Sequence, residues 1–359
     1  MHRIVLAFLL WTLSPAPLAA EAVPATRPRG DAILALPDPL RRRLHDEVLI
    51  GVDTPDARFV ALLRFLHDPD GLAMRYADDA TLTVAEAAQA REANCVTFTL
   101  LFLALAREAG LDAEPMRIRR ILSWRRDGAT VYLDSHVFAR VRIGRRAHAV
   151  DFAVEPVLPG EPPEAIDDAR LLGLYWNNLA MDRLADGDTV QASALLQRAL
   201  ALEPAYPPYL SNAGVIALRA GDPGGAARAY ASALARAPED AGALFNSVAL
   251  ARRMGDTPHA EALQRRLERV QRRDPLQQIL QGMAREREGR PDEALIHYRR
   301  AVRLRDDEPR FHAALARACT AAGDGRCADR AWSRAIALAS GALREDYRRE
   351  REAARVARR

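Results

Sequence analysis

Hydrophobic and polar positions recur with a fixed period in the C-terminal half of the chain. Aligned with itself on its alanines and prolines, this half repeats every 34 residues, and position 20 of every repeat is alanine. Position 8 is small or apolar, whereas position 24 is leucine, tyrosine or tryptophan in four of the five repeats. Such a period predicts pairs of helices that pack closely through the small positions. The repeats start at residues 173, 207, 241, 275 and 309.

Prolines mark the boundaries between these predicted pairs. Pro204 and Pro238 stand at position 32 of the first two repeats, where a proline ends the second helix. The pattern resembles the tetratricopeptide repeat, and this resemblance implies an all-α solenoid over 173–342. The arginine-rich segment 343–359 is predicted to be a polar C-terminal capping helix.

Asparagine occupies position 6 of the first three repeats, at Asn178, Asn212 and Asn246. Amides at this spacing would line a superhelical groove, where they could bond the backbone of a bound protein or peptide. Asparagine at this position is also similar to the repeat consensus, where it ties neighbouring helices together. Both roles stay open on the sequence.

The N-terminal half shows helical spacing first and strand spacing later. Thr54-Pro55 is typical of a helix start, residues 83–86 have the form of a capping box, and a buried helix is predicted between Asn94 and Gly110. The period then changes to two, which predicts strands over 116–124, 130–143 and 147–154. We therefore expect an α+β domain over 31–170, with helices on an antiparallel sheet. Residues 156–163, with four prolines, are expected to connect it to the repeats.

The first 22 residues predict a secretory signal peptide. A basic start, an apolar run over 4–13 and small residues at its end are typical of such a segment. We expect an exported protein, periplasmic if the source is a Gram-negative bacterium. Nothing else reaches 18 consecutive apolar residues, so the mature chain is expected to lack a membrane span.

Composition narrows the function classes. The 52 basic residues, all of them arginine, nearly balance 48 acidic ones, and the net charge of +4 indicates neither a disordered chain nor a cationic nucleic-acid binder. The sequence has no His-x-x-x-His pattern, no paired-cysteine cluster and no phosphate-binding glycine motif. No metal and no other cofactor is expected.

The chain has only three cysteines. Cys319 and Cys327 flank a predicted turn between two helices of the last repeat, so we predict a disulfide, with two buried thiols as the alternative. Cys95 is then unpaired at the first turn of a helix, where free N–H groups and the helix dipole favour a thiolate. That position suits a nucleophile, although a small buried hydrophobic residue would also fit it.

A hairpin downstream supplies the groups that a thiol nucleophile needs. A turn of two residues at Gly144 would pair residues whose numbers add up to 289, and a turn of four residues would pair residues whose numbers add up to 291. In both registers Asp151 lies on the same face of the hairpin as His136. An aspartate diagonal to a histidine could hold the imidazole in one tautomer while its second nitrogen takes the thiol proton. The sequence thus predicts a triad of Cys95, His136 and Asp151, with His148 on the opposite face.

The residues around this triad are similar to a known family. The run 94–111, with Asn94-Cys95 at its start, followed by His136-Val137 and by Val150-Asp151-Phe152, resembles the nucleophile helix and two strands of the transglutaminase-like superfamily in its bacterial cysteine-protease-like branch. The resemblance covers about 80–160. It implies a papain-like fold with Cys95 as nucleophile, His136 as base and Asp151 as the group that orients it.

The implied chemistry is acyl transfer from an amide through a thioester, to water in a hydrolase or to an amine in a transglutaminase. The backbone N–H of Cys95 and the side chain of Gln89 are candidate donors to the oxyanion. Two function classes stay open: an exported cysteine hydrolase whose repeats recruit a protein or peptide, and a non-catalytic scaffold for protein–protein interaction.

Overall fold

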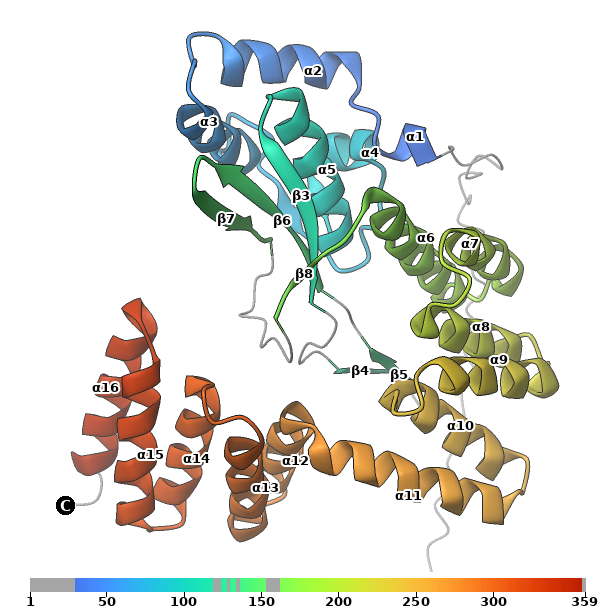
Figure 1. Cartoon of the computed structure of the whole chain (residues 1–359), viewed down its shortest axis with the longest axis vertical. Coiled ribbons are helices and arrows are strands. Elements are labelled where there is room, and N and C mark those ends of the chain that lie inside the picture. Colours follow the sequence, from blue (N-terminus) through green and yellow to red (C-terminus); the bar gives the residue numbers. More distant parts are fainter. Residues whose placement is uncertain (1–29, 119–123, 128–129, 134–135, 153–161, 357–359) are drawn as a thin grey trace, which may run out of the picture.

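The computed structural model describes residues 30–118, 124–127, 130–133, 136–152 and 162–356. The predicted signal peptide and most of the predicted connector over 156–163 therefore lie outside the described residues. Within the described parts, the chain forms a helical and sheet-containing region up to about residue 166, followed by an all-helical array (Figure 1).

The N-terminal region begins with helices whose starts follow from the sequence. Thr54 caps α3 by accepting a hydrogen bond from the backbone N–H of Ala57, and the predicted capping box between Thr83 and Glu86 is present at the start of α4. The helices are α1 (Gly30–Ile33), α2 (Asp38–Leu44), the π-helix η1 (His45–Leu49), α3 (Pro55–His67), α4 (Val84–Ala90) and α5 (Cys95–Glu108).

The main sheet has four strands in the order β7-β6-β3-β8, and every neighbouring pair is antiparallel. Its strands are β3 (Asp112–Ile118), β6 (His136–Ile143), β7 (Arg146–Val150) and β8 (Glu164–Ala165). Two short strands, β1 (Arg75–Tyr76) and β2 (Glu92–Ala93), pair in parallel beside it. Helix α5 packs on β6 and β3, so an antiparallel sheet covered by helices is observed.

The predicted strands over 116–124 and 130–143 are wrong in their limits. The first strand starts four residues earlier, at Asp112, and residues 124–127 and 130–133 pair with each other as a separate hairpin of β4 (Trp124–Asp127) and β5 (Thr130–Leu133). The dipeptide Asp127-Gly128 is typical of tight turns in sequence, and the observed pairing of β4 with β5 takes these residues out of the main sheet. Strand β5 instead lies against α10 of the helical array.

The predicted helix pairs are present from α6 onward, as a tetratricopeptide-like array that runs down from α6 to α10 and then turns below the sheet in the view of Figure 1. Each pair turns at a glycine with positive φ, and these glycines recur every 34 residues, at 187, 221, 255, 289 and 323. The pairs are α6 (Asp168–Ala185) and α7 (Thr189–Leu202), α8 (Pro207–Arg219) and α9 (Pro223–Arg236), α10 (Ala241–Arg253) and α11 (Thr257–Arg273), α12 (Pro275–Arg287) and α13 (Pro291–Leu304), α14 (Pro309–Ala321) and α15 (Gly325–Leu338).

The last helix, α16 (Gly341–Val356), covers the end of the array, where a capping helix is predicted over 343–359; residues 357–359 lie outside the described part of the chain. Its buried Tyr347 packs on Trp332 with ring centroids 5.9 Å apart, and Glu350 accepts two hydrogen bonds from Arg317. No helix in the described part of the chain is both long and apolar enough to cross a membrane.

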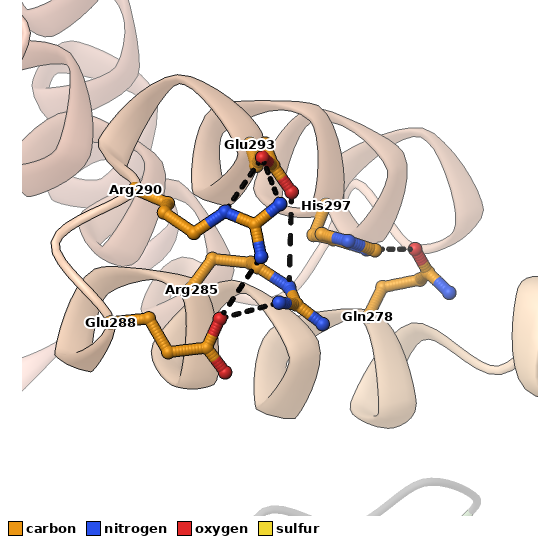
Figure 2. A network of polar contacts seen from close by, with 6 residues as sticks. All are labelled: Gln278, Arg285, Glu288, Arg290, Glu293 and His297. Carbon is orange, nitrogen blue, oxygen red and sulfur yellow. Dashed lines mark hydrogen bonds and ion pairs between the residues drawn. The ribbon is translucent and has the colours of Figure 1, made fainter.

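One repeat lacks the aspartate that caps the second helix of the other four pairs. Arg290 stands there, and its side chain makes no capping hydrogen bond. It pairs instead with Glu288 and Glu293, and Arg285 joins the same network between α12 and α13 (Figure 2). Ion pairs between solvent-accessible side chains contribute little to stability. The network therefore compensates only in part for the missing helix cap. The aspartates of the other pairs are Asp188, Asp222, Asp256 and Asp324.

Residue size is matched between positions 8 and 24 of a repeat. A Cβ on Gly214 would lie 2.4 Å from the ring of Tyr230, and a Cβ on Gly282 would lie 2.4 Å from the ring of Tyr298. Both tyrosines are buried, so their rings have little room to move. The glycines therefore permit the close approach of two helices around a large side chain.

The hydrophobic core does not end at the predicted domain boundary near residue 170. One cluster of buried residues runs from Ile33 through α5 and the sheet into the first two repeats, and it ends at Leu250 on the first helix of the third repeat. Buried Arg117 of β3 reinforces this contact, since it bonds Glu164 and donates a 2.7 Å hydrogen bond to the hydroxyl of Tyr206 between α7 and α8. The first repeats are thus part of the same folding unit as the sheet.

We predict that Gly214→Ala is destabilising only while Tyr230 is present. Helix propensity favours alanine by about 1 kcal/mol, but forcing a methyl group into a filled site costs about 1–3 kcal/mol. A double-mutant cycle with Tyr230→Leu, which imitates the Ala180 and Leu196 pair of the first repeat, should give a coupling of roughly that size in urea unfolding. Equal effects in both backgrounds would contradict the size matching.

We also predict that a chain ending at residue 172 does not fold cooperatively. Truncation there removes buried residues of α6 such as Leu174, Tyr175 and Trp176, and it exposes the side of the core that α6 to α9 cover. A chain ending at residue 253 keeps every member of this cluster and is the matched control. The measurement is near-ultraviolet circular dichroism through a urea titration, and a sharp transition in the shorter chain would contradict the shared core.

Candidate functional site

Cys95 is held at the start of the most deeply buried helix. It is the first residue of α5, and the preceding Asn94 caps this helix by accepting a 2.9 Å hydrogen bond from the backbone N–H of Thr97. Ten of the 14 residues of α5 are buried, whereas Cys95 itself is half-buried and its thiol is free. A thiol there lies beside the N–H groups of the first turn, which have no acceptor within the helix.

His136 and Asp151 meet across the hairpin of β6 and β7. Ile143 pairs with Arg146, which leaves two residues in the turn and makes opposite residues sum to 289, the first of the two registers considered. His136 begins β6, Asp151 directly follows β7, and Nε2 of the imidazole lies 2.8 Å from each carboxylate oxygen. The His136 ring is 4% exposed, so the carboxylate is its main source of charge compensation.

The imidazole also reaches the thiol. The side chain of Cys95 interacts with the imidazole of His136 and contributes to the raised pKa of the ring, so one ring interacts with both the cysteine and the aspartate. With Nε2 facing the carboxylate, Nδ1 is the nitrogen that remains for the sulfur. The structure therefore brings the three residues of the predicted triad together in the order that proton transfer needs.

The charges around His136 favour its protonated form. Burial works to lower the pKa of the imidazole, but hydrogen bonds with Asp151 and Cys95, together with the negative charges of these two groups, raise the pKa to about 9. At neutral pH the ring is consequently an imidazolium between two acceptors. A proton taken from the thiol would be retained and could later be given to a leaving group.

Phe152 anchors the aspartate segment on the nucleophile helix. Its ring stacks on Phe98, one turn after Cys95, with centroids 4.2 Å apart and planes 3° apart, and it also contacts His67 and Tyr76. Asp151 is thereby fixed by its neighbour in sequence, although it lies beyond the paired part of β7. Sequence reasoning gave Phe152 no structural role; its place directly after the aspartate was the available signal.

His148 lies on the opposite face of the hairpin. Its ring packs 5.1 Å from that of Phe59 on α3, away from the triad. Its Nε2 is buried and makes no hydrogen bond with the residues that the structure describes. The alternation along β7 thus separates the two histidines, and His148 offers a matched control for His136.

Gln89 is exposed near the end of α4, and no hydrogen bond joins it to the described residues around Cys95. The backbone N–H of Cys95, at the first position of α5, lies beside the sulfur by covalent geometry. Of the two oxyanion donors considered, the backbone group is therefore the one whose position is fixed. Gln89 stays a prediction.

The three asparagines predicted for a peptide groove differ in their surroundings. Asn212 donates a 2.7 Å hydrogen bond to Asn177 of the preceding repeat, which is the structural role that the sequence left open. Asn246 is only 7% exposed, and Asn178 is half-buried. Asn178 thus offers more of its surface than Asn246, and Asn212 already has a partner.

The third repeat contains a hollow where its sequence departs from the pattern. Gln264 stands at position 24, where other repeats have a large apolar or aromatic residue, and it lines a cavity of about 390 Å³ together with Arg252 and Glu261. This cavity lies between α10 and α11, far along the chain from the triad. It is a feature of the repeat surface.

The other two cysteines are joined. Cys319 of α14 and Cys327 of α15 form a disulfide with a Cα–Cα distance of 5.7 Å across the turn of the last repeat. The described residues include no group of three or more histidine, cysteine, aspartate or glutamate side chains arranged to hold a metal ion.

No family model matches the chain. Two curated proteins are similar to part of it: cellulose synthase 2 operon protein C of Komagataeibacter xylinus, 37% identical over 119 residues, and cellulose synthase operon protein C of Xanthomonas axonopodis pv. citri (strain 306), 39% identical over 119 residues. Each alignment covers 32% of this chain, and 9% and 7% of the respective relative. The chain thus spans less than a tenth of the length of these relatives.

Solved structures with similar helices include Pseudomonas aeruginosa pilF, at 16% identity and a TM-score of 0.29, over 49% of this chain and 80% of that one. A thermophilic TPR protein of Thermus thermophilus, TTC0263, has 22% identity and a TM-score of 0.28, over 51% and 99%. MamA has 15% identity and a TM-score of 0.26, over 45% and 94%. The repeat architecture of this chain rests on its own helix pairs and their period.

We predict that the stability of the protein falls as the pH rises from about 6.5 to about 9. The pKa of His136 is raised in the folded state, so the stabilisation from its protonated form is complete below the unfolded pKa near 6.5 and is lost as pH rises through about 9. The loss should be roughly 3 kcal/mol at most in urea unfolding. Asp151→Asn should flatten this dependence, and an equally steep one in the variant would contradict the assignment.

Proposed function

We propose that the chain is a cysteine acyl-transfer enzyme, with hydrolysis of an amide as its reaction. The observation that carries the proposal is the position of His136, whose ring bonds the Asp151 carboxylate and interacts with the Cys95 side chain. A buried imidazole with one acceptor on each side is costly as mere core packing and is suited to proton transfer. The resemblance to the transglutaminase-like superfamily supports the same roles.

In the proposed reaction, the proton of the Cys95 thiol is held by the His136 imidazolium, and the sulfur attacks the carbonyl carbon of the amide. The oxyanion that forms is stabilised by the N–H groups at the start of α5, including that of Cys95. The imidazolium protonates the leaving amine, the C–N bond breaks, and a thioester remains. Water, deprotonated by His136, then attacks the thioester, which releases the acid and restores the thiol.

We propose a recruiting role for the repeats, with a protein or peptide as the partner. Support comes from the tetratricopeptide-like array and from the partly accessible Asn178 on its first helix. Export is part of the same proposal. It rests on the apolar segment within residues 1–22 and on the disulfide between Cys319 and Cys327, a bond that persists in oxidising compartments.

The second candidate is a non-catalytic scaffold for protein–protein interaction. The extent of the repeat array favours it, because α6 to α16 run from Asp168 to Val356 and make up more than half of the chain. In this case the triad would be a hydrogen-bonded core element. The two candidates differ in one measurable property, the reactivity of Cys95 in the folded protein.

We predict that p-nitrophenyl acetate acetylates Cys95 in the folded protein, to give a thioester that hydroxylamine removes. Intact-mass spectrometry should detect one acetyl group in the wild type and none in Cys95→Ala. His136→Ala should slow acetylation by about 100-fold or more, since the base is lost. His148→Ala, a change on the opposite face of the same hairpin, should leave the rate unchanged.

The opposite outcome would favour the scaffold. If Cys95 reacts only after denaturation, the thiol is not available to substrates and the acyl-transfer proposal fails. If His136→Ala and His148→Ala slow the reaction equally, the effect comes from damage to the hairpin and not from proton transfer.

A further inference from the structure

The residue that caps the nucleophile helix is held by a segment outside that helix. The backbone N–H of Asn94 donates a 3.3 Å hydrogen bond to the carbonyl of Ala80, and Nδ2 of its side chain donates a 2.8 Å hydrogen bond to the hydroxyl of Thr81. Thr81 and Asn94 are each 4% exposed, so the side-chain bond lies in a low-dielectric environment that strengthens it. Two successive residues of one segment therefore bond the residue that directly precedes Cys95.

The next residue of the same segment bonds the other end of the first turn. The backbone N–H of Leu82 donates a 2.9 Å hydrogen bond to the hydroxyl of Thr97, and that hydroxyl donates to the carbonyl of Leu82 at 3.2 Å. Thr97 is completely buried. Cys95 thus lies in the chain between two residues, Asn94 and Thr97, that the segment 80–82 holds.

The chemistry of three groups fixes how the Asn94 amide is turned. The backbone N–H of Thr97 can only donate, so the atom that faces it at 2.9 Å is Oδ1 of Asn94. Nδ2 then points toward Thr81, whose hydroxyl is its acceptor. Without this hydroxyl, Nδ2 would lose its buried acceptor, and the amide would gain by rotating away from Thr97. The Thr81 hydroxyl therefore secures the orientation that caps α5.

The cap also decides which N–H groups of the first turn are occupied. The N–H of Thr97 bonds Oδ1 of Asn94, and the N–H of Phe98 bonds the Asn94 carbonyl at 2.8 Å. The N–H groups of Cys95 and Val96 make no hydrogen bond with the residues that the structure describes. The two donors nearest to the sulfur are therefore left for the oxyanion of the proposed reaction.

We propose that Thr81 is a positioning residue for the nucleophile: through the Asn94 side chain it fixes the first turn of α5, and with it the Cys95 sulfur and the two N–H groups beside it. This inference rests on the proposed function, since it assigns a role within the acyl-transfer site. A displacement of about 1 Å at the reacting groups can slow a reaction by about 100-fold. A hold on the helix start therefore has a consequence for the rate as well as for stability.

Amide hydrogen exchange tests the positioning role without reference to catalysis. Thr81→Val replaces the hydroxyl by a methyl group and keeps the branched shape of the side chain. In this variant the Thr97 amide should exchange about tenfold faster than in the wild type, because the Asn94 side chain that bonds it is released. The adjacent Phe98 amide bonds the backbone carbonyl of Asn94 and is the internal reference that should not change. A general loss of stability would accelerate both.

Acetylation of Cys95 by p-nitrophenyl acetate gives the second readout. We expect the rate constant to fall about tenfold in Thr81→Val and to recover to within about threefold of wild type in Thr81→Ser, which keeps the hydroxyl. Thr83→Val is the matched control, since Thr83 is a buried threonine that caps the neighbouring helix α4 by accepting from the N–H of Glu86. It removes a helix cap away from Cys95 and should leave the rate unchanged.

The outcomes separate the two proposals. If Thr97 exchange is the same in the wild type and Thr81→Val, the positioning role is overturned, whatever the acetylation rates. It is also overturned if Thr81→Ser does not restore the rate, or if Thr83→Val slows acetylation equally, because packing then explains the effect. If Thr97 exchange responds but the wild-type thiol is never acetylated, the hold on the helix start is supported and the acyl-transfer function fails. Thr81→Ala gives the same comparison with a smaller side chain if Thr81→Val does not fold.

Discussion

Burial of α5 on nearly all sides is the constraint on which the rest of the structure depends. A helix that is apolar around its whole circumference needs a cover on every face. Strands β3 and β6 cover one side, helices α2 to α4 cover others, and α6 of the first repeat completes the enclosure. In the first turn of α5, Cys95 is partly accessible. The same packing that stabilises the domain therefore presents the thiol.

This arrangement also explains why charged groups are concentrated at one end of α5. His136 and Asp151 come from different strands of the hairpin, yet their ion pair lies near the start of α5, beside Cys95. Free N–H groups there stabilise negative charge, and an imidazolium with a pKa of about 9 adds a positive one. A buried site that favours charge separation suits a thiol nucleophile, and it would give a purely structural core no advantage.

The array beyond the second repeat is held by different means. Each pair turns at a glycine with positive φ, and most second helices start with an aspartate cap, so the pairs form from local chemistry. Separate small cores in α10–α11 and in α12–α16 replace the continuous core of the first repeats. In this part of the array each repeat packs mainly on its neighbours. One repeat can therefore depart from the pattern, as at Gln264, while the other repeats stay folded.

The sequence by itself determined the features that depend on short-range periodicity. The 34-residue period predicted the helix pairs, the capping residues Thr54, Thr83 and Asn94 predicted helix starts, and alternation along the hairpin placed His136 and Asp151 on one face. These features follow from 3.6-residue and two-residue periods that act between neighbours in the chain. The limits of the strands were wrong, because a local hairpin competed with the main sheet for residues 124–133.

Only the tertiary structure decided which of these elements share a core and how the site is supported. The contact between the sheet and the first repeats depends on Arg117 meeting Tyr206, 89 residues away in the chain, and the support of the α5 cap depends on Asn94 meeting Thr81. Neither pair has a pattern in the sequence. The reason is physical: periodicity tells which face of an element is buried, but the partner that buries it is chosen by the packing of the whole chain.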